Sequence, residues 1–374
     1  MTDFPQAEYE ARLARAQALM RADGMDALLL CTEAEFRYFS GFRTLFWQSP
    51  TRVWCLLVPA DGAPIAVIPE IGADLMAQTW ISDIRTFPAP GGEAEGQRLL
   101  RSALAGCRRI GLPMGAESSL RMPLADFERL RAGLDAEFTD ATPLVRALRM
   151  VKSPAEIALL RRICGIGSAA FARAPELFHE GQPLDAAFRA FRIALLEAGA
   201  DDIPYLVGGA GPGGYSGVIS PPDDRALREG DVLMLDTGAT LAGYFCDFDR
   251  NWAVRDASDD ASRMHETLWR ATDAGLTAAR PGATCADLFH AMSGILGGGS
   301  EIGRLGHGLG MQLTEWPSLA PHDNTVLEPG MVLTLEPSLS RSDGRIMVHE
   351  ENILITDGAP DLLTDRAPRE LPVI

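Results

Sequence analysis

The sequence predicts an α/β domain over residues 1–148, followed by an α+β domain over residues 149–374 that consists of two similar halves. Three observations lead to this prediction. The chain has 374 residues, which exceeds the usual size of one domain. Strand-like apolar runs alternate with helical segments over residues 1–145. Beyond them, the order of two helices followed by several strands occurs twice, as a repeat of pattern and not of sequence identity.

The elements of the first domain follow from apolar spacing and turn residues. Residues 7–23 carry apolar side chains at helical spacing and Gly24 follows them, so we expect a helix that ends there. A buried strand is expected in "MDALLLC". A hairpin or a meander is expected in "RVWCLLVPADGAPIAVIP", whose apolar runs flank an Asp-Gly turn. The segment "EAEGQRLLRSALAGC" is helical by the same criteria, and "RRIGLP" predicts a further strand.

The second domain begins with a clear helix start after the short segment "ALRMVKS", where we place the domain boundary. Ser153 can cap the helix, Pro154 occupies its first position, and Glu156 completes a capping box. A second helix is predicted in "PLDAAFRAFRIALLEAG", and two more over 259–280 and 285–296. Strands are predicted in "MVLTLEPSL" and "RIMVHEENILIT".

Composition and charge exclude several classes of protein. The formal net charge of −17 argues against nucleic acid or an anionic membrane as the main partner. The six cysteines form no CxxC pair and indicate reduced thiols in a cytoplasmic protein. The acidic N-terminal segment has no apolar core of a signal peptide, and no apolar run is long enough to span a bilayer.

The segment "GAGPGG", residues 209–214, matches the GxGxxG pattern of dinucleotide-binding loops. That pattern binds a pyrophosphate only where a strand precedes it and a helix N-terminus follows it. Here "YSGVISPPDD" follows, and a double proline cannot lie inside a helix. The sequence therefore argues against dinucleotide binding. It predicts a flexible or tightly turned loop, or one that lets the backbone approach a small ligand.

Four carboxylates stand in strand-like apolar surroundings of the second domain. Asp236 ends the run "VLML", and Asp247 lies in the next strand-like stretch. The intervening "GATLAG" can turn the chain, so the two strands can be antiparallel neighbours. Glu336 closes "MVLTL", and Glu350 lies between apolar runs. A buried unpaired carboxylate is costly, so each must pair with a cation, take up a proton or bind a metal ion.

His307, in the glycine-flanked segment "HGLGMQLTEWPS", completes a possible ligand set with these acids. Taken alone, each acid is more often a cap, a turn residue or an ion-pair partner, and one histidine is more often a core residue. Together, carboxylates with one imidazole suit divalent ions. We expect Mn²⁺ first, with Co²⁺, Fe²⁺ or Zn²⁺ as alternatives. Four acids exceed what one ion usually needs, which predicts two ions that share bridging carboxylates.

The ordered set Asp, Asp, His, Glu, Glu resembles the metal site of the M24, or pita-bread, metallopeptidase family. "DTGATLAGYFCDFDR" looks like its two-aspartate motif, "GHGLG" like its histidine motif, and "LEPSL" and "EENILIT" like its two glutamate motifs. The first half, from "RLARAQALMRADGMDALLL" to "YFSGF", resembles the N-terminal domain of the aminopeptidase P, prolidase and creatinase branch. The resemblance covers nearly the whole chain. It implies a curved antiparallel sheet covered by helices in the second domain, and a homodimer.

Carried over by position, the resemblance also implies roles for the ligands. Asp236 would bind one ion terminally, Asp247 and Glu350 would bridge two ions, and His307 and Glu336 would hold the other. Family members use a metal-bridging water or hydroxide as the nucleophile. Glu336 matches the glutamate that accepts a proton in relatives and is the predicted catalytic residue. The implied reaction is metal-dependent hydrolysis of a C–N bond in a small substrate, as in Xaa-Pro dipeptidases.

The sequence departs from the peptide-cleaving members where these carry two further histidines. One position lies seventeen residues before the first aspartate and is Ile219 here. The other lies seven residues after the histidine ligand and is Thr314. Val348 stands where an arginine is common. Isoleucine can neither position a scissile carbonyl nor shuttle a proton, so the metal site is kept while its peptide-handling surroundings differ.

These departures leave three functions open. The first is the metal-dependent hydrolase. The second is a metal enzyme acting on a zwitterionic osmolyte, similar to dimethylsulfoniopropionate lyase or ectoine hydrolase, with Glu336 or Glu315 as base. The third is a non-catalytic binding protein, which the complete ligand set argues against. Aromatic and polar residues near the motifs are the predicted substrate pocket, since an aromatic ring beside acids suits a cationic group: Tyr215, Ile219, Tyr244, Thr314, Glu315, Trp316, His349 and, from an N-terminal domain, Trp47.

Overall fold

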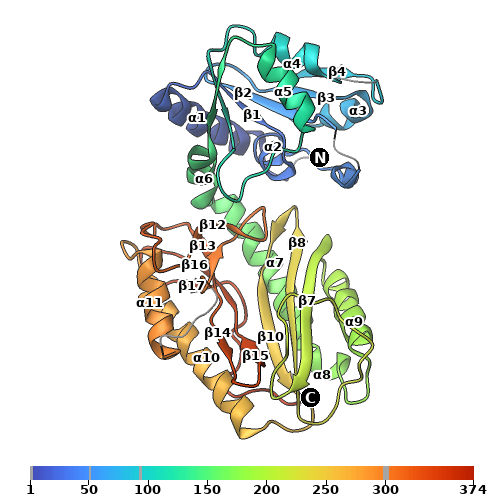
Figure 1. Ribbon diagram of the computed structural model, residues 1–374, viewed down its shortest axis with the longest axis vertical. Helices are drawn as coiled ribbons and strands as arrows, with labels where there is room; N and C mark the ends of the chain where they lie inside the picture. Colours follow the sequence, from blue (N-terminus) through green and yellow to red (C-terminus); the bar gives the residue numbers. More distant parts are fainter. Residues whose placement is uncertain (1–2, 50–51, 92–94, 298–302) are drawn as a thin grey trace. The chain divides into compact units, whose positions relative to one another are not determined.

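The chain divides into two units, Met1–Arg149 and Met150–Ile374, and Figure 1 labels most of their helices and strands. The computed structural model describes residues 3–49, 52–91, 95–297 and 303–374. Within these ranges no helix is both long and apolar enough to cross a lipid bilayer.

A six-stranded mixed sheet forms the centre of the first unit, in the order β4-β3-β2-β1-β5-β6. The predicted hairpin is present, because β2 and β3 pair antiparallel on either side of the Asp-Gly turn. β1 pairs antiparallel with β2 and parallel with β5, which makes the sheet mixed. The strands are β1 (Ala27–Leu30), β2 (Cys55–Pro59), β3 (Ile65–Pro69), β4 (Asp83–Phe87), β5 (Arg109–Leu112) and β6 (Glu137–Asp140).

The helices of the first unit begin and end where the chain carries breakers. The predicted first helix ends at Gly24, whose φ of 67° is left-handed and favours glycine. Leu100, Leu104 and Leu130, from α4 and α5 and their ends, pack on apolar residues of β1, β2 and β5. The helices are α1 (Gln6–Asp23), α2 (Glu33–Ser40), η1 (Leu45–Gln48), η2 (Glu70–Gly72), α3 (Ala73–Met76), α4 (Gln97–Ala103), α5 (Leu124–Ala132) and α6 (Thr142–Met150).

The first half of the second unit places two long helices before an antiparallel sheet. The predicted capping box is present at the start of α7, where Ser153 and Glu156 exchange hydrogen bonds with each other's backbone N–H groups. Helix α7 contacts β8, and α9 contacts β7. Sheet order is β10-β8-β7, with β9 also paired to β8. The elements are α7 (Pro154–Ala172), α8 (Ala174–Leu177), α9 (Leu184–Glu197), β7 (Asp202–Pro212), β8 (Asp231–Leu241), β9 (Tyr244–Phe245) and β10 (Phe248–Ala253).

The second half repeats this order, as predicted. Helices α10 and α11 pack on the face of a second antiparallel sheet that carries Leu333, Leu335 and Ile353. That sheet has the order β12-β11-β13-β16-β17, and β14 and β15 form a separate ribbon. The elements are α10 (Asp259–Ala278), α11 (Cys285–Ile295), β11 (His307–Gly308), β12 (Glu315–Ser318), β13 (Val332–Leu335), β14 (Ser338–Ser340), β15 (Ile346–Val348), β16 (Glu351–Leu354) and β17 (Asp361–Leu362).

Two predicted strands of the second half are each divided between the two sheets. "MVLTLEPSL" becomes β13 and β14, and "RIMVHEENILIT" becomes β15 and β16. β13 pairs with β16, whereas β14 pairs with β15. The chain therefore changes sheets at Glu336–Pro337 and again at His349–Glu350. Continuous strands were the wrong expectation here, because apolar periodicity does not show which partner a segment pairs with.

The segment "GAGPGG" also differs from its predicted loop. Gly209 and Gly211 lie within β7, paired to β8, and the turn begins only at Gly213 and Gly214. The next helix after β7 is α10, so no helix N-terminus follows the glycines. The glycines therefore lack the helix that a dinucleotide site requires.

Candidate metal centre

The five predicted ligands come from five segments of the second unit, each at or beside a strand. Asp236 lies within β8, Asp247 directly precedes β10, His307 begins β11, Glu336 follows β13 and Glu350 precedes β16. Four of the five side chains are buried, and Glu336 is partly exposed. Both glutamates stand where the chain changes sheets, so their side chains are released from the regular alternation of a strand.

Pairing of β8 with β10 brings the aspartates to one side. The register sets Asp236 directly opposite Asp249. Residues opposite each other in an antiparallel pair share a face, as do residues two apart on a strand. Asp236, Asp247 and Asp249 therefore face the same way. Asp249 was not among the predicted ligands, although the alternating acids of "DFDR" were a signal for it.

Asp247, His307 and Glu350 form the tightest group. One ligand atom from each of these buried side chains lies within 4.8 Å of the others. The His307 Nε2 to Asp247 Oδ2 distance is 3.4 Å. Because metal–ligand bonds are about 2.0–2.5 Å long, donor atoms at this spacing can bind one shared cation.

The orientation of the His307 ring is fixed by its own backbone. Nδ1 lies 2.9 Å from the carbonyl oxygen of Gly308. A carbonyl only accepts, so Nδ1 carries the hydrogen and Nε2 directs its lone pair toward Asp247. Burial lowers the pKa of His307 to about 4 and keeps the ring neutral. A neutral imidazole with a free Nε2 is the form that binds a metal ion.

The carboxylates around His307 are strongly perturbed. Burial, and then repulsion by Glu336, raises the pKa of Asp236 to about 8. Burial raises the pKa of Glu336 to about 7. Asp247 and Glu350 have pKa values well above the usual range, because both are buried and neighbouring acids repel their charge. Such a cluster must hold either protons or cations.

Two carboxylate oxygens of the cluster indicate that it binds cations and not only protons. Asp236 Oδ1 and Glu350 Oε1 are buried and find no hydrogen-bond partner among the residues that the structure describes. A divalent cation would satisfy these oxygens and compensate the clustered charge together. Four carboxylates with one neutral imidazole therefore fit a site for divalent ions, and these residues would hold them.

Two residues near the cluster carried no signal in the sequence. Tyr205, on β7, stands opposite Gly238, two residues along β8 from Asp236. Its side chain favours the charged form of Asp236, while burial and then the charge of Asp236 raise the pKa of Tyr205 itself. Burial raises the pKa values of Asp247 and Glu336, and the positive charge of Arg304 offsets part of that rise. Tyr205 reaches the site through the pairing of β7 with β8, which a linear motif does not show.

The two predicted pocket tyrosines are buried and bind other parts of the unit. Tyr215 donates its hydroxyl hydrogen to Asn251 Oδ1 at 3.2 Å and accepts from Val348 N–H at 2.6 Å. Tyr244 donates to Glu156 Oε1 at 2.9 Å. Both hydroxyls therefore join elements of the second unit.

The remaining predicted pocket residues differ in exposure. Ile219 is 74% exposed in the segment between β7 and β8. Thr314 and Trp316 are partly exposed before and within β12. Trp47 lies in the first unit, where its ring contacts Phe36 and Trp54. Their role in binding a substrate stays a prediction.

Glu315, the alternative base, is occupied by a buried ion pair. Its Oε2 lies 3.3 Å from Nζ of Lys152, the only lysine of the chain. Its Oε1 accepts hydrogen bonds from the backbone N–H groups of Met311 and Gln312, at 2.7 and 3.2 Å. These contacts favour a structural role in the segment between β11 and β12, and they favour Glu336 as the base.

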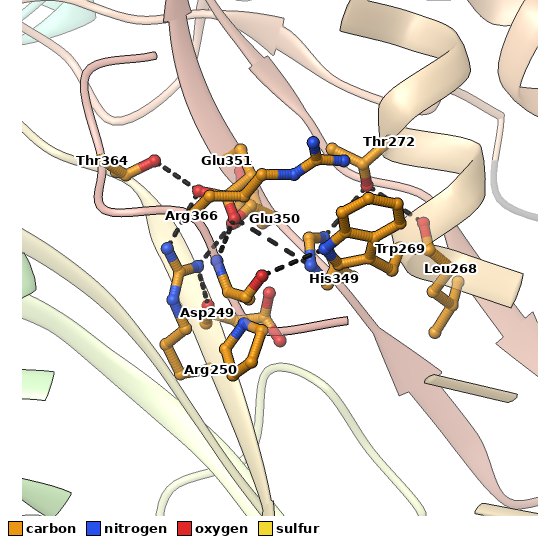
Figure 2. Close-up of polar contacts among 12 residues, drawn as sticks. Asp249, Arg250, Leu268, Trp269, Thr272, His349, Glu350, Glu351, Thr364 and Arg366 are labelled. Carbon is orange, nitrogen blue, oxygen red and sulfur yellow. Dashed lines mark hydrogen bonds and ion pairs between the residues drawn. The ribbon is translucent and has the colours of Figure 1, made fainter. Parts of the chain in front are cut away.

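A buried polar network lies beside Glu350 (Figure 2). Arg250 donates from Nη1 to the Glu350 carbonyl oxygen and from Nη2 to Glu351 Oε2, both at 2.9 Å. His349 Nδ1 lies 3.0 Å from Thr272 Oγ1, whose hydrogen goes to the Leu268 carbonyl, so Nδ1 is the donor. The network fixes the backbone on both sides of the Glu350 side chain.

Asn352 joins the two halves directly at a predicted ligand. It is fully buried. Its Oδ1 accepts from the Asp247 N–H at 3.0 Å, and its Nδ2 donates to the Asp247 carbonyl oxygen. The side-chain amide of Asn352 thus pairs with both backbone groups of Asp247, as a residue on a neighbouring strand would. We call the contacts of Asn352 with Asp247 and of Arg250 with Glu350 and Glu351 the seam between the halves.

We expect Asn352→Ala to lower metal affinity about 10–100-fold, the usual effect of losing a group that orients a ligand. The change leaves the Asp247 backbone unpaired, so Asp247 is no longer held against Glu350. Isothermal titration of the metal-free protein with Mn²⁺ measures the effect. Cys164→Ala is the matched control, because its thiol lies 3.4 Å from Asn352 Oδ1. A folded Asn352→Ala protein with unchanged affinity would contradict this role.

Two family models match the chain in succession. The model of the creatinase/prolidase N-terminal domain matches residues 12–151. The model of metallopeptidase family M24 matches residues 158–357, more than half of the chain. These matches agree with the order of domains predicted from the motifs.

Known proteins and structures resemble the chain along nearly its whole length. A probable dipeptidase PepE of Mycobacterium tuberculosis is 28% identical, covering 98% of this chain and 96% of that protein. A Xaa-Pro dipeptidase of Pyrococcus horikoshii is 26% identical, covering 94% and 96%. The crystal structure of dipeptidase PepE from Mycobacterium ulcerans is 26% identical and superposes with a TM-score of 0.86, covering 99% of each chain. The resemblance and the predicted fold class are confirmed.

Proposed function

Because the chain belongs to metallopeptidase family M24, a family of metal-dependent hydrolases, we propose that it hydrolyses the C–N bond of a dipeptide with two divalent ions. One observation carries the proposal: ligand atoms of Asp247, His307 and Glu350 gather within 4.8 Å of one another. The charges of Asp236 and Glu336 raise the pKa values of Asp247 and Glu350 in this group, so both carboxylates lie near it. The proposed ligands are therefore Asp236, Asp247, His307, Glu336 and Glu350.

The proposed chemistry divides between the ions and the chain. Bound divalent ions would lower the pKa of a water molecule and polarise the scissile carbonyl. Glu336 is suited to receive the proton of the attacking water, because it alone among the five is partly exposed and burial brings the pKa of its carboxyl to about 7. The same carboxyl can then give the proton to the leaving amine.

Printed names of relatives support the substrate class. One relative is named a probable dipeptidase and another a Xaa-Pro dipeptidase. Mn²⁺ as the first metal, with Co²⁺, Fe²⁺ or Zn²⁺ as alternatives, follows from the carboxylate-rich donor set. A homodimer and a cytoplasmic location are part of the same proposal.

A substrate screen tests the proposal. The purified protein, loaded with Mn²⁺, is given Xaa-Pro dipeptides, dipeptides without proline, ectoine and dimethylsulfoniopropionate. We expect release of free amino acids from at least one dipeptide class, and none after chelation. Loaded protein that cleaves no dipeptide would refute the dipeptidase proposal. Failure to bind any of the four metals would refute a metal enzyme of either kind.

The osmolyte enzyme remains the second candidate because of Ile219 and Thr314. Neither residue can supply the imidazole that peptide-cleaving members carry there, and Ile219 is largely exposed. In the same screen, cleavage of dimethylsulfoniopropionate or opening of the ectoine ring, without dipeptide hydrolysis, would establish this alternative.

A further inference from the structure

A sixth carboxylate, that of Asp249, faces the candidate metal centre from β10. The register of β8 with β10 places Asp249 directly opposite Asp236, and it follows Asp247 by two residues, so the three side chains share one face. Only 2% of Asp249 is exposed. Its carboxylate must therefore find its partners inside the protein.

One oxygen of this carboxylate is held by Asn251, and the other is open. Asn251 Nδ2 donates to Asp249 Oδ2 and to the Val348 carbonyl oxygen, both at 2.7 Å. Asn251 Oδ1 accepts from the Tyr215 hydroxyl at 3.2 Å, which fixes the orientation of the amide. Within the described ranges of the chain, Asp249 Oδ1 finds no hydrogen-bond partner. The carboxylate is thus oriented with one oxygen available to a cation.

The adjacent arginine does not supply that cation (Figure 2). Arg250 Nη1 donates to the backbone carbonyl oxygens of Asp249 and Glu350, and its Nη2 donates to the Glu351 carboxylate. The guanidinium therefore binds backbone groups and Glu351, and the Asp249 Oδ1 atom stays unpaired.

The open oxygen belongs to the same charge cluster as the predicted ligands. Burial, and then the charge of Asp236, raises the pKa of Asp249. Burial and the other acids raise the pKa values of Asp247 and Glu350, and the charge of Asp249 adds to that rise. Asp249 therefore lies near three of the five predicted ligands. It adds a third open oxygen to those of Asp236 and Glu350.

We propose that Asp249 Oδ1 is a further ligand of the divalent ion that Asp236 binds, and that it selects a hard, six-coordinate ion at this position. With Asp247 and Glu350 as bridging ligands, this ion would meet carboxylate oxygens only, whereas the other ion would also meet the imidazole of His307. Mn²⁺ and Mg²⁺ suit oxygen ligands in octahedral geometry, while Zn²⁺ prefers four ligands that include nitrogen or sulfur. The inference rests on the proposed two-ion centre and deepens it.

Metal titration of Asp249→Asn tests the proposal without any turnover. The amide keeps an oxygen for the Asn251 hydrogen bond and replaces only the open oxygen, so the fold should persist. Calorimetry of the metal-free wild type should show two Mn²⁺ ions per chain. In Asp249→Asn the affinity for one of them should fall at least about 10-fold, the smallest effect usual for a group that supports a metal ligand. Zn²⁺ affinity should change much less.

Two outcomes of this titration overturn the inference. Equal Mn²⁺ affinities of wild type and Asp249→Asn would show that Asp249 is not a ligand. A fall of the same size for Zn²⁺ would show that Asp249 does not select between the metals.

Asp231→Asn is the matched control for this substitution. Asp231 lies on β8 five residues before Asp236, hence on the opposite face, and it is equally buried. Both of its oxygens accept from Arg225, at 2.7 and 2.8 Å. The control should bind both ions as the wild type does. A comparable loss of Mn²⁺ affinity in the control would mean that the effect of Asp249→Asn comes from packing, and would overturn the inference.

A crystal of the wild type grown with Mn²⁺ tests the proposal even if Asp249→Asn does not fold. An anomalous scattering peak within about 2.5 Å of Asp249 Oδ1 supports it, and Mn²⁺ bound only farther away overturns it. Neither measurement involves a dipeptide. The metal assignment can therefore stand if no dipeptide is cleaved, and it can fail while dipeptide hydrolysis is established.

Discussion

Replacement of Asp247 by alanine is expected to abolish turnover and to lower metal affinity by more than about 100-fold, beyond the effect of losing a group that only orients a ligand. Asp247 lies 3.4 Å from His307 Nε2 and shares the ligand group with Glu350. Its removal leaves both partners facing an empty position. Asn352 still binds the backbone of residue 247 in this variant, so the backbone should remain in place. Activity should therefore be lost because the carboxylate ligand is missing and not because the fold has changed.

Metal content by mass spectrometry and steady-state kinetics measure the effect of Asp247→Ala. Asp202→Asn is the matched control, because Asp202 is an exposed residue at the start of β7 in the same sheet. The control should keep its metal and its activity. Retained turnover in Asp247→Ala would refute the metal mechanism.

Metal removal should destabilise the protein, and increasingly so as the pH rises. Folding raises the pKa of Glu336 to about 7 and that of Asp236 to about 8. A group with a raised folded pKa contributes its full stability below its unfolded pKa, and loses it as the pH rises through the folded value. Without metal, stability should therefore fall from about pH 4.5, just above the unfolded pKa of ordinary carboxyls, to about pH 8, where Asp236 loses its proton in the folded state.

Bound cations take the place of these protons, so the loaded protein should not show this fall. A few pKa units correspond to roughly 3 kcal/mol or more, which amounts to on the order of 10 °C in Tm for a domain of this size. Thermal unfolding with and without a chelator, at the two ends of the window, measures the difference. Asp247→Ala should lose most of the response to the chelator. A chelated wild type whose Tm is the same at both pH values would contradict the prediction.

The ligand set was predictable from the sequence because each member leaves a local anomaly. Asp236 and Glu336 close apolar runs, and His307 lies among glycines. The helix starts were predictable for a similar reason, since the capping box of α7 involves only residues three positions apart. Asp249 carried the same kind of signal, in its alternation with Asp247.

Other features depended on which strands meet, and the sequence does not contain that information locally. Tyr205 reaches Asp236 only through the register of β7 with β8. Arg304 reaches Thr314 only because Leu305 pairs with both Leu319 and Glu336. The division of "RIMVHEENILIT" between two sheets was missed, because its apolar periodicity continues across the point at which the pairing partner changes.

The seam gives the bound ions a further property. Asp236 and Asp247 belong to the first half of the unit, whereas His307, Glu336 and Glu350 belong to the second. An ion liganded from both halves ties them together, so we expect loss of the ion and opening of the seam to be coupled. The rate at which bound metal exchanges with a labelled isotope would then report how often the two halves separate. Asn352→Ala should raise that exchange rate.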